Sequence, residues 1–458
     1  MAVASAGGLS CRFRASRCRA WGGVAMDTQR WRWLLPGIGL KRWLMVSALG
    51  VVIALVGLWI LLAGQPTAWL DALYRGLKTQ IHTWATTSHG EQVMRFTVGI
   101  ALMAVGGSVW WWGLRRAWRT MMRILQPRAS GRVWDVLSRQ VLLRHGRRIA
   151  VIGGGTGLST MLRGLKRYTA NIVAVVTVTD DGGSSGRLRT ELGILPPGDI
   201  RNCLIALADA EGAMTALLQH RFPSESGTLS GHSVGNLLLA AMTQITGDFE
   251  KGVQEMSKVL AIRGRVLPST LSHVSLRAEM DDGTCVEGET AIVEHPARIR
   301  RMHLVPADPK PPEEVVEAIR NAEIVVLGPG SLFTSVIPNL LVPRIVDALV
   351  STRAVRVYVC NVMTQPGETD QFTASDHVRA IEAHAGRRVC DYVLVNTAVP
   401  RAELLERYRA SGQMMVEPDI DRIRVMGYRV VAGDFISESD YVRHDPIKLA
   451  EAILKLGR

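Results

Sequence analysis

The sequence predicts an α/β protein with a Rossmann-like, doubly wound and mostly parallel sheet, a small β-hairpin subdomain and two preceding transmembrane helices. Three observations lead to this fold class: short apolar runs that end in small or polar residues, helical patterns between those runs, and two long uncharged stretches in the first third. The predicted segments are a basic amino-terminal cytoplasmic part at 1–43, a transmembrane hairpin at 44–114, a basic juxtamembrane linker at 115–146 and a Rossmann-like domain at 147–458.

The two uncharged stretches are long and apolar enough to cross a membrane as helices. Residues 44–64 carry no charge, and residues 96–114 end in Trp110 to Trp112, which suits a membrane interface. Basic residues flank the pair, so the positive-inside rule places both ends in the cytoplasm and residues 65–93 outside. A cleaved signal peptide fits poorly, because the first apolar run starts after residue 40 without a small-residue cleavage site. We therefore expect a two-span protein of the cell membrane with its large domain in the cytoplasm.

Charge and tryptophan separate the first third of the chain from the rest. The net charge is +13, but residues 1–43 hold eight Lys/Arg against one acid and residues 115–148 hold ten against one, which leaves residues 149–458 slightly negative. All twelve tryptophans lie between Trp21 and Trp134. The basic excess is juxtamembrane, so we expect no nucleic-acid partner. The six cysteines show no C-x-x-C spacing, which indicates a reduced cytosolic domain without structural zinc, and Met26 is an alternative start to Met1.

The Rossmann-like domain opens with a glycine loop. Residues 149–152 are an apolar run typical of a buried strand, and leucines at 158, 162 and 165 then indicate a helix whose first amides favour an anion such as phosphate. The loop fits neither a dinucleotide-binding G-x-G-x-x-G motif, because Leu158 and Thr160 stand at the required glycine positions, nor a P-loop, because no Gly-Lys-Ser/Thr follows. A tight turn is the structural alternative. The loop consists of Gly153, Gly154, Gly155, Thr156 and Gly157.

Aspartates follow the second predicted strand, which spans residues 172–178. Asp180 and Asp181 come directly after it, and the carboxyl ends of parallel strands share one edge, so both should lie beside the first glycine loop. We expect Asp180 to bind an Mg²⁺ that bridges to a diphosphate, with Asp199 as a second ligand; the alternative is a hydrogen bond from Asp180 to ribose. Asp199 also starts a predicted helix that runs to residue 209, where plain capping is its alternative role.

Polar turns recur further along the chain. The turn at 230–236 precedes an apolar helix at 237–245; Asn236 is a candidate to bind a base or sugar, and His232 is either a general base or a loop histidine bonded to the backbone. Residues 274–280 and 285–293 flank Asp-Asp-Gly-Thr, which indicates a hairpin.

A second glycine loop follows a later predicted strand. Strands are expected at 324–327, 355–360 and 392–395, each ending in small or polar residues. Gly328, Gly330 and Ser331 follow the first of these strands. We expect this loop to face the first glycine loop across a ligand crevice where the winding of the sheet reverses.

Six motifs in residues 147–458 closely resemble the gluconeogenesis factor family. They are IGGGTGLST, VTDDGGSSGRLR, PPGDIRNCLIALAD, GHSVGNLLLAA, LGPGSLFTSVIPNLLV and NVMTQPGETDQFTASDHV. The resemblance implies a Rossmann-like fold, binding of a UDP-sugar such as UDP-N-acetylglucosamine, and a role in cell shape and envelope synthesis on gluconeogenic carbon. The family is related to 2-phospho-L-lactate transferase, whose magnesium-binding GDD loop matches Asp180. The match of its later acidic loop to Asp199 is loose, because PPGDIRN stands in place of a longer acidic run.

Two function classes remain. The first is a membrane-tethered regulator that binds a nucleotide sugar without turning it over, and the second is an Mg²⁺-dependent transferase acting on a nucleotide-diphosphate-linked donor. No catalytic residue is assigned, which favours the regulator. The expected partners are the nucleotide sugar and the membrane, and a homo-oligomer is an open expectation. The expected nucleotide-binding residues are Gly153, Gly154, Gly155, Thr156, Gly157, Asp180, Asp181, Asn202, Asn236, Gly328, Gly330 and Ser331, and the expected metal ligands are Asp180 and Asp199.

Overall fold

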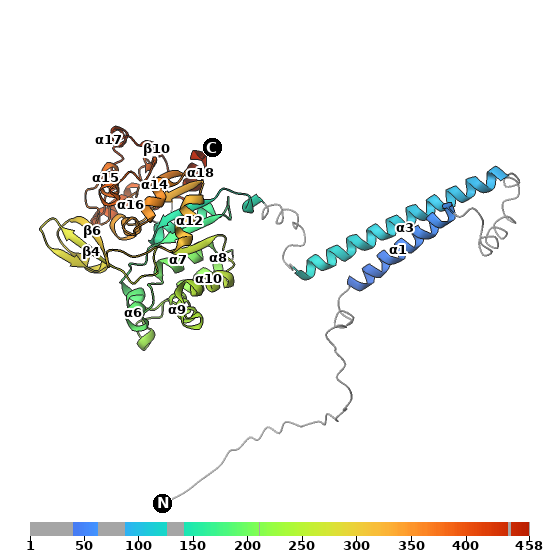
Figure 1. The fold of residues 1–458 in the computed structure, drawn as a ribbon, viewed down its shortest axis with the longest axis horizontal. Coiled ribbons are helices and arrows are strands. Elements are labelled where there is room, and N and C mark those ends of the chain that lie inside the picture. Colours follow the sequence, from blue (N-terminus) through green and yellow to red (C-terminus); the bar gives the residue numbers. More distant parts are fainter. Residues whose placement is uncertain (1–39, 63–87, 126–141, 210, 438–440, 458) are drawn as a thin grey trace, which may run out of the picture. The chain divides into compact units, whose positions relative to one another are not determined.

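The computed structural model describes residues 40–62, 88–125, 142–209, 211–437 and 441–457 (Figure 1). The chain divides into two compact units between Val136 and Leu137. The first unit is a pair of long helices, and the second is an α/β domain. The predicted α/β fold with a mostly parallel sheet is confirmed, and the two predicted spans are long apolar helices.

The helical unit consists of α1 (Leu40–Leu62) and α3 (Ser88–Leu125). Lys41–Leu62 and Phe96–Thr120 are long and apolar enough to cross a membrane, with mean hydropathies of 2.7 and 1.4. Helix α3 continues well past residue 114, where the sequence predicted the juxtamembrane linker to begin. Arginine has a high helix propensity and can extend its charged head away from an apolar surface, so the basic residues after 114 do not end the helix.

The two helices pack through glycines that recur every seven residues. Gly50 on α1 meets Gly106 on α3, and Gly57 meets Gly99, while Gly113 on α3 meets the backbone of Ser47 and Trp43 on α1. A Cβ atom built on Gly50 would lie 2.4 Å from the backbone nitrogen of Trp110, and one on Gly106 would lie 2.5 Å from that of Ala54. The helices thus touch backbone to backbone, as is usual where small residues line a membrane helix interface. The seven-residue period keeps these contacts on one seam along both helices.

The seam predicts different outcomes for two adjacent glycines. Gly106→Ala should separate the helices, because its methyl group collides with the backbone of Ala54, whereas a Cβ on Gly107 would meet no atom within 4 Å. We expect Gly106→Ala to lower the SDS fraction at which the detergent-solubilised full-length protein loses its native tryptophan fluorescence, and Gly107→Ala to leave it unchanged. All twelve tryptophans lie in residues 21–134, so this signal reports on the helical unit. An equal response of the two variants would contradict the seam.

The α/β unit is built on a parallel sheet. Within the described residues the sheet has seven strands in the order β10-β9-β8-β7-β1-β2-β3. From β1 the chain winds outward through β2 to β3, and from β7 it winds the other way to β10, so the direction reverses between β1 and β7. Ligands of open α/β sheets bind at such a switch point. The strands are β1 (Ile149–Gly153), β2 (Ile172–Val176), β3 (Arg265–Pro268), β7 (Ile324–Leu327), β8 (Val355–Val359), β9 (Tyr392–Asn396) and β10 (Arg429–Gly433).

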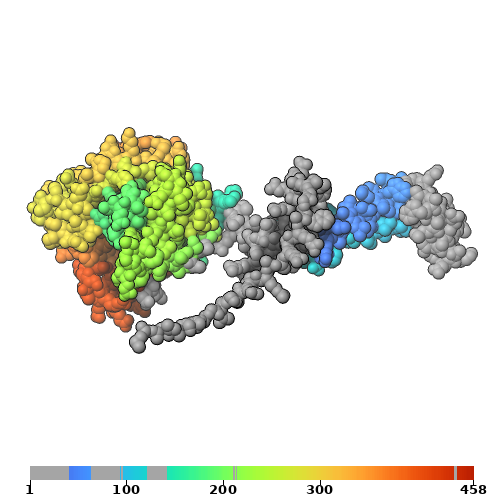
Figure 2. Space-filling view, turned by 90° about the horizontal axis from the view of Figure 1, so that it is seen from below, coloured from blue at the N-terminus to red at the C-terminus, as the bar shows by residue number. Residues whose placement is uncertain are grey.

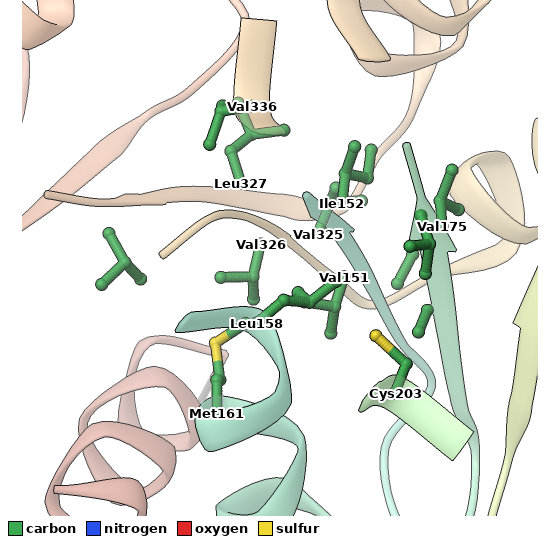
Figure 3. Packing of buried hydrophobic residues seen from close by; sticks show 14 of the residues in the cluster. Val151, Ile152, Leu158, Met161, Val175, Cys203, Val325, Val326, Leu327 and Val336 are labelled. Atoms are coloured by element: carbon green, nitrogen blue, oxygen red, sulfur yellow. The ribbon is translucent and has the colours of Figure 1, made fainter. Parts of the chain in front are cut away.

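The central strands are buried on both faces, as parallel strands covered by helices are. Val151 and Val326 are register partners in β1 and β7. Figure 3 shows their side chains near Leu158 and Met161 of α5 (Gly155–Leu165) and Cys203 of α7 (Gly198–Leu207). This core holds the carboxyl ends of β1 and β7 in fixed positions. The opposite face carries Ile152, Leu327 and Val336, all fully buried.

A three-stranded antiparallel sheet forms a lobe at one side of the unit, drawn yellow in Figures 1 and 2. It contains β4 (Ser275–Met280), β5 (Cys285–Glu287) and β6 (Ile299–Val305). The predicted hairpin is present, but its second strand ends at Glu287 and not at residue 293. Gly288 has a φ of +100°, and α11 (Glu289–Glu294) starts directly after it. Sequence periodicity missed both this helix and the third strand.

Other segments also differ from the predicted pattern. Residues 183–192 form α6, a helix that the sequence patterns did not predict, and Asp199 lies in the first turn of α7 without capping it, since the N-cap is Pro197. A bent apolar pair, Leu332–Leu340 with Ile345–Ser351, lies largely buried in the α/β core. The remaining elements are α8 (Glu211–Gln219), η2 (Gly227–Leu229), α9 (Val234–Thr246), α10 (Phe249–Val259), α12 (Glu313–Asn321), the π-helix η3 (Leu332–Val336), α13 (Ile337–Leu340), α14 (Ile345–Ser351), α15 (Ala374–Ala385), α16 (Ala402–Ala410), α17 (Ile420–Val425) and α18 (Pro446–Leu456).

Candidate functional site

The two glycine loops meet at the switch point of the sheet, where β1 and β7 end. A Cβ atom on Gly157 would lie 2.7 Å from the carbonyl oxygen of Pro329, and one on Gly330 would lie 3.1 Å from that of Gly154. Both predicted loops are thus brought together, but they touch each other directly. The ligand space has to lie beside this junction and not between the loops.

Several polar groups of the second glycine loop are hydrogen-bonded to other parts of the domain. The amide of Gly328 donates to the carbonyl of Ile152 at 2.8 Å. Asn361 accepts from the amide of Gly330 at 3.3 Å and donates to the carbonyl of the same residue at 2.8 Å. The hydroxyl of Ser331 donates to Glu368. The amides of Gly328 and Gly330 are therefore bonded within the fold, and the loop braces the junction.

Glu368 fixes the start of the π-helix that follows the second loop. Besides Ser331, its carboxylate accepts from the amide of Phe333 at 3.2 Å and from the hydroxyl of Thr334 at 3.4 Å. Burial raises the pKa of this carboxyl, while these donors oppose the rise. The sequence gave Glu368 no role, because no local pattern shows that it lies near a loop more than thirty residues away.

The first glycine loop keeps open donors. Its helix, α5, has Gly154 as N-cap and so has no side-chain cap. The amide of Gly155 donates to Asp199. The next two amides, of Thr156 and Gly157, have no acceptor within the helix, since the first amides of any α-helix lack one. Together with the helix dipole they form an anion-binding position.

Those amides open on a cavity of about 430 Å³. The cavity is lined by the first loop, the second loop, the segment 361–365 after β8, and residues 442–444 near the carboxyl end. Of the lining residues, Arg443 carries a positive charge, and it stacks on Tyr441 at 5.3 Å. His444 is buried in the wall, and burial lowers its pKa to about 4, so it is neutral at physiological pH. Sequence reasoning assigned neither residue.

Three carboxylates from separate elements interact electrostatically near the first glycine loop. Asp180 follows β2 and accepts from the amide of Gly182 at 3.0 Å, Asp199 lies in α7, and Glu289 starts α11. Burial raises the pKa of Asp199 to about 6; the Gly155 amide opposes this, and the charge of Asp180 adds to it. Burial, followed by the charges of Asp180 and Asp199, raises the pKa of Glu289 to about 9. Glu289 is a further residue that sequence reasoning missed.

Asp181 has a different position from Asp180. Its carboxylate accepts from the amide of Glu289 at 2.7 Å, the amide of Thr290 at 3.1 Å and the hydroxyl of Thr290 at 2.8 Å. It therefore satisfies the first turn of α11 from outside and ties the acidic loop to the three-stranded lobe.

Arg201 hydrogen-bonds to Asn202 and Asn236, the two asparagines predicted to bind the nucleotide. Its guanidinium donates to Asn202 at 2.9 Å, to Asn236 at 2.9 Å and to the hydroxyl of Ser233 at 2.5 Å. Because a guanidinium can only donate, both amide oxygens turn toward it and both NH₂ groups turn away. Asn236 is buried and donates to Ser184 at 3.0 Å, so within this network Asn202 is the half-exposed member.

His232, the candidate general base, is also buried. Its Nδ1 lies 3.0 Å from the hydroxyl of Ser184, and burial, with a contribution from Arg187, lowers its pKa. The histidine is therefore satisfied by a side chain and not by backbone. It joins the same hydrogen-bond network as Asn236.

Asp180 and Asp199 have the chemistry to bind Mg²⁺ together with a phosphate group. Asp180 and Asp199 supply the hard oxygen ligands that Mg²⁺ prefers. Within the described ranges, no group of three or more His, Cys, Asp or Glu side chains is placed to hold a metal by itself. Mg²⁺ is usually held by one or two carboxylates with the remaining ligands from phosphate and water, so a phosphate-bearing ligand would complete the site.

Comparison with known proteins identifies the α/β unit. A family model described as 2-phospho-L-lactate transferase CofD matches residues 149–436. The chain belongs to this family. The gluconeogenesis factor of Bacillus subtilis is 50% identical over 310 residues, which cover 68% of this chain and 98% of that protein. A solved structure of a UPF0052 family member from Bacillus halodurans is 51% identical, with a TM-score of 0.65, and covers 67% of this chain and 99% of that one. The predicted gluconeogenesis factor resemblance is confirmed.

The helical unit is shared with another CofD-family relative. A gluconeogenesis factor relative from Nostoc sp. is 47% identical over 431 residues, 93% of this chain and 92% of that protein. The part of the chain outside this match is shorter than the stretch that contains both helices, so the match includes residues of the helical unit. The match therefore extends beyond residues 147–458, where the six motifs lie.

The contact between the glycine loops predicts the effect of one added methyl group. Gly157→Ala places a Cβ against the backbone of Pro329, so it should lower the free energy of unfolding by about 1–3 kcal/mol despite the better helix propensity of alanine. Gly212→Ala, in helix α8 with no atom within 4 Å of its Cβ, is the matched control and should stabilise by up to about 1 kcal/mol. Thermal unfolding of the α/β unit checks both, and a stable Gly157→Ala protein would show that the loops do not touch.

Proposed function

We propose that this protein is a membrane-tethered regulator that binds a nucleotide sugar of the UDP-N-acetylglucosamine type in its cytoplasmic domain. The observation that carries the proposal is the start of α5, where uncapped amides open on a cavity with a single arginine among its lining residues. The cavity volume lies in the range of small-molecule and cofactor sites. The diphosphate would accept from the amides of Thr156 and Gly157 and face Arg443.

Asp180 and Asp199 would hold Mg²⁺ beside the first glycine loop, where it would bridge to the diphosphate. Two carboxylates beside a diphosphate repel it unless a cation lies between them. Glu289 adds to that repulsion when it is ionised, and the raised pKa values of Asp199 and Glu289 show how strongly the position disfavours uncompensated negative charge. The metal assignment is thus supported by the repulsion among these carboxylates and by the match of the Asp180 loop to the transferase.

The alternative function is an Mg²⁺-dependent transferase acting on a nucleotide-diphosphate-linked donor. The match to the CofD family model favours it. Such a reaction needs a group that activates the acceptor, and the ring of His232, the base considered from sequence, is buried and already hydrogen-bonded to Ser184. We therefore favour binding without turnover. The regulatory output would be envelope synthesis and cell shape during growth on gluconeogenic carbon, as the family resemblance implies.

A substitution at Asp180 tests the site. Asp180→Asn keeps the shape and the hydrogen-bond acceptor for Gly182 but loses the charge. We expect it to weaken binding of UDP-N-acetylglucosamine tenfold or more with Mg²⁺ present, about 1.4 kcal/mol, and to have little effect with a chelator. Isothermal titration calorimetry under the two conditions measures this. Equal losses would favour the ribose contact over the metal, and no binding of any nucleotide sugar by the unmodified protein would refute the proposed function.

Topology gives a separate test of the membrane proposal. We expect two spans with basic outer flanks to keep the α/β unit inside the cell. In intact cells, an impermeant maleimide should label a cysteine placed at Thr86 but not the native exposed Cys285. After permeabilisation both should react. Labelling of Cys285 from outside would invert the topology.

A further inference from the structure

One end of the helix pair carries an arginine held between two tryptophans. The Arg116 guanidinium carbon lies 5.4 Å from the ring centroid of Trp43 on α1 and 5.5 Å from that of Trp112 on α3. The two rings meet edge to face, with centroids 5.1 Å apart and an interplanar angle of 90°. Contact with two rings fixes the position of the guanidinium, whose five N–H donors exceed what these ring contacts use.

The glycine seam builds this cluster. A Cβ atom on Gly113 would lie 2.7 Å from the backbone nitrogen of Ser47 and 3.0 Å from the carbonyl oxygen of Trp43. The hydroxyl of Ser47 donates to the carbonyl of Trp110 at 3.4 Å. The backbones that carry the two rings are thus fixed against each other before any ligand arrives, which lowers the entropic cost of binding.

The surroundings of the cluster are cationic and apolar. Lys41, Arg42, Arg115 and Arg119 belong to the same helix ends, and the described residues 40–47 and 110–120 contain no acid. The neighbouring side chain of Leu114 is 41% exposed, so an apolar surface continues from the charged cluster along the helix. An anion that binds here would therefore do best if it carried hydrocarbon chains.

We propose that Trp43, Trp112 and Arg116 form a headgroup site for an anionic phospholipid. The lipid phosphate accepts from the edge of the Arg116 guanidinium, and its acyl chains lie along the apolar helix surface. Basic residues at the inner leaflet attract anionic lipids in general, but the stacked arginine adds a fixed donor at one place. The site is independent of nucleotide binding.

The test compares matched variants of the full-length protein in detergent. Native mass spectrometry would measure the affinity for phosphatidylglycerol and for phosphatidylcholine. We expect a preference for phosphatidylglycerol that falls about tenfold in Arg116→Gln and clearly less in Arg119→Gln, a cation of the same helix for which no ring contact is described. Trp43→Leu should also reduce the preference, while Trp111→Leu, at an exposed ring, should not. Circular dichroism confirms that the helices are retained.

Each outcome bears on the proposal. Equal losses in Arg116→Gln and Arg119→Gln would mean diffuse attraction to a basic surface and would overturn the site. Competition by glycerol phosphate as strong as that by phosphatidylglycerol would show a free-phosphate site and would overturn the lipid assignment. If Arg116→Gln or Arg119→Gln loses its helicity, Trp43→Leu and Trp111→Leu are compared instead, because both keep all the arginines. Equal lipid preference in these two variants would then overturn the site.

Discussion

The backbone contact between the two glycine loops is the constraint on which the α/β unit depends. Two strands that run parallel at the centre of the sheet end side by side, and their loops touch so closely that a Cβ on Gly157 would collide with the carbonyl of Pro329. The start of α5 lies at this contact and lines the cavity. It also explains why the second loop needs internal partners: Asn361 and Glu368 satisfy polar groups that the junction removes from water.

The acidic residues around the junction divide into two kinds. Asp181 and Glu368 each accept several hydrogen bonds from the fold, and their charges are distributed over those donors. Asp180, Asp199 and Glu289 face one another, with the Arg201 guanidinium as the cation that offsets part of their charge. Asp181 and Glu368 thus stabilise the fold around the site. The mutual repulsion of Asp180, Asp199 and Glu289 would be relieved by a bound cation. Sequence patterns assigned ligand roles to Asp180, Asp181 and Asp199 and none to Glu289 and Glu368, so the patterns did not separate the two kinds.

Sequence patterns recovered the central strands well, because buried parallel strands are continuous apolar runs; β7 begins and ends where it was predicted. The pattern failed for α6, whose two glycines and two serines at the start have low intrinsic helix propensity. Both glycine loops and Asp180 were found because each follows a strand end. Arg201, Glu289 and Arg443 were missed, because their proximity to the site depends on connections between distant segments, which no local period encodes.

The three hydrogen bonds from α11 to Asp181 connect the ligand loop mechanically to the three-stranded lobe. If Asp180 shifts toward a ligand, Asp181 has to shift with it. Helix α11 then moves together with Asp181, or the hydrogen bonds between them break, and losing a typical helix cap costs about 0.5–2 kcal/mol. The position of the acidic loop and that of the three-stranded lobe are thus coupled through one carboxylate, so a movement of either requires these three hydrogen bonds to move with it or to break.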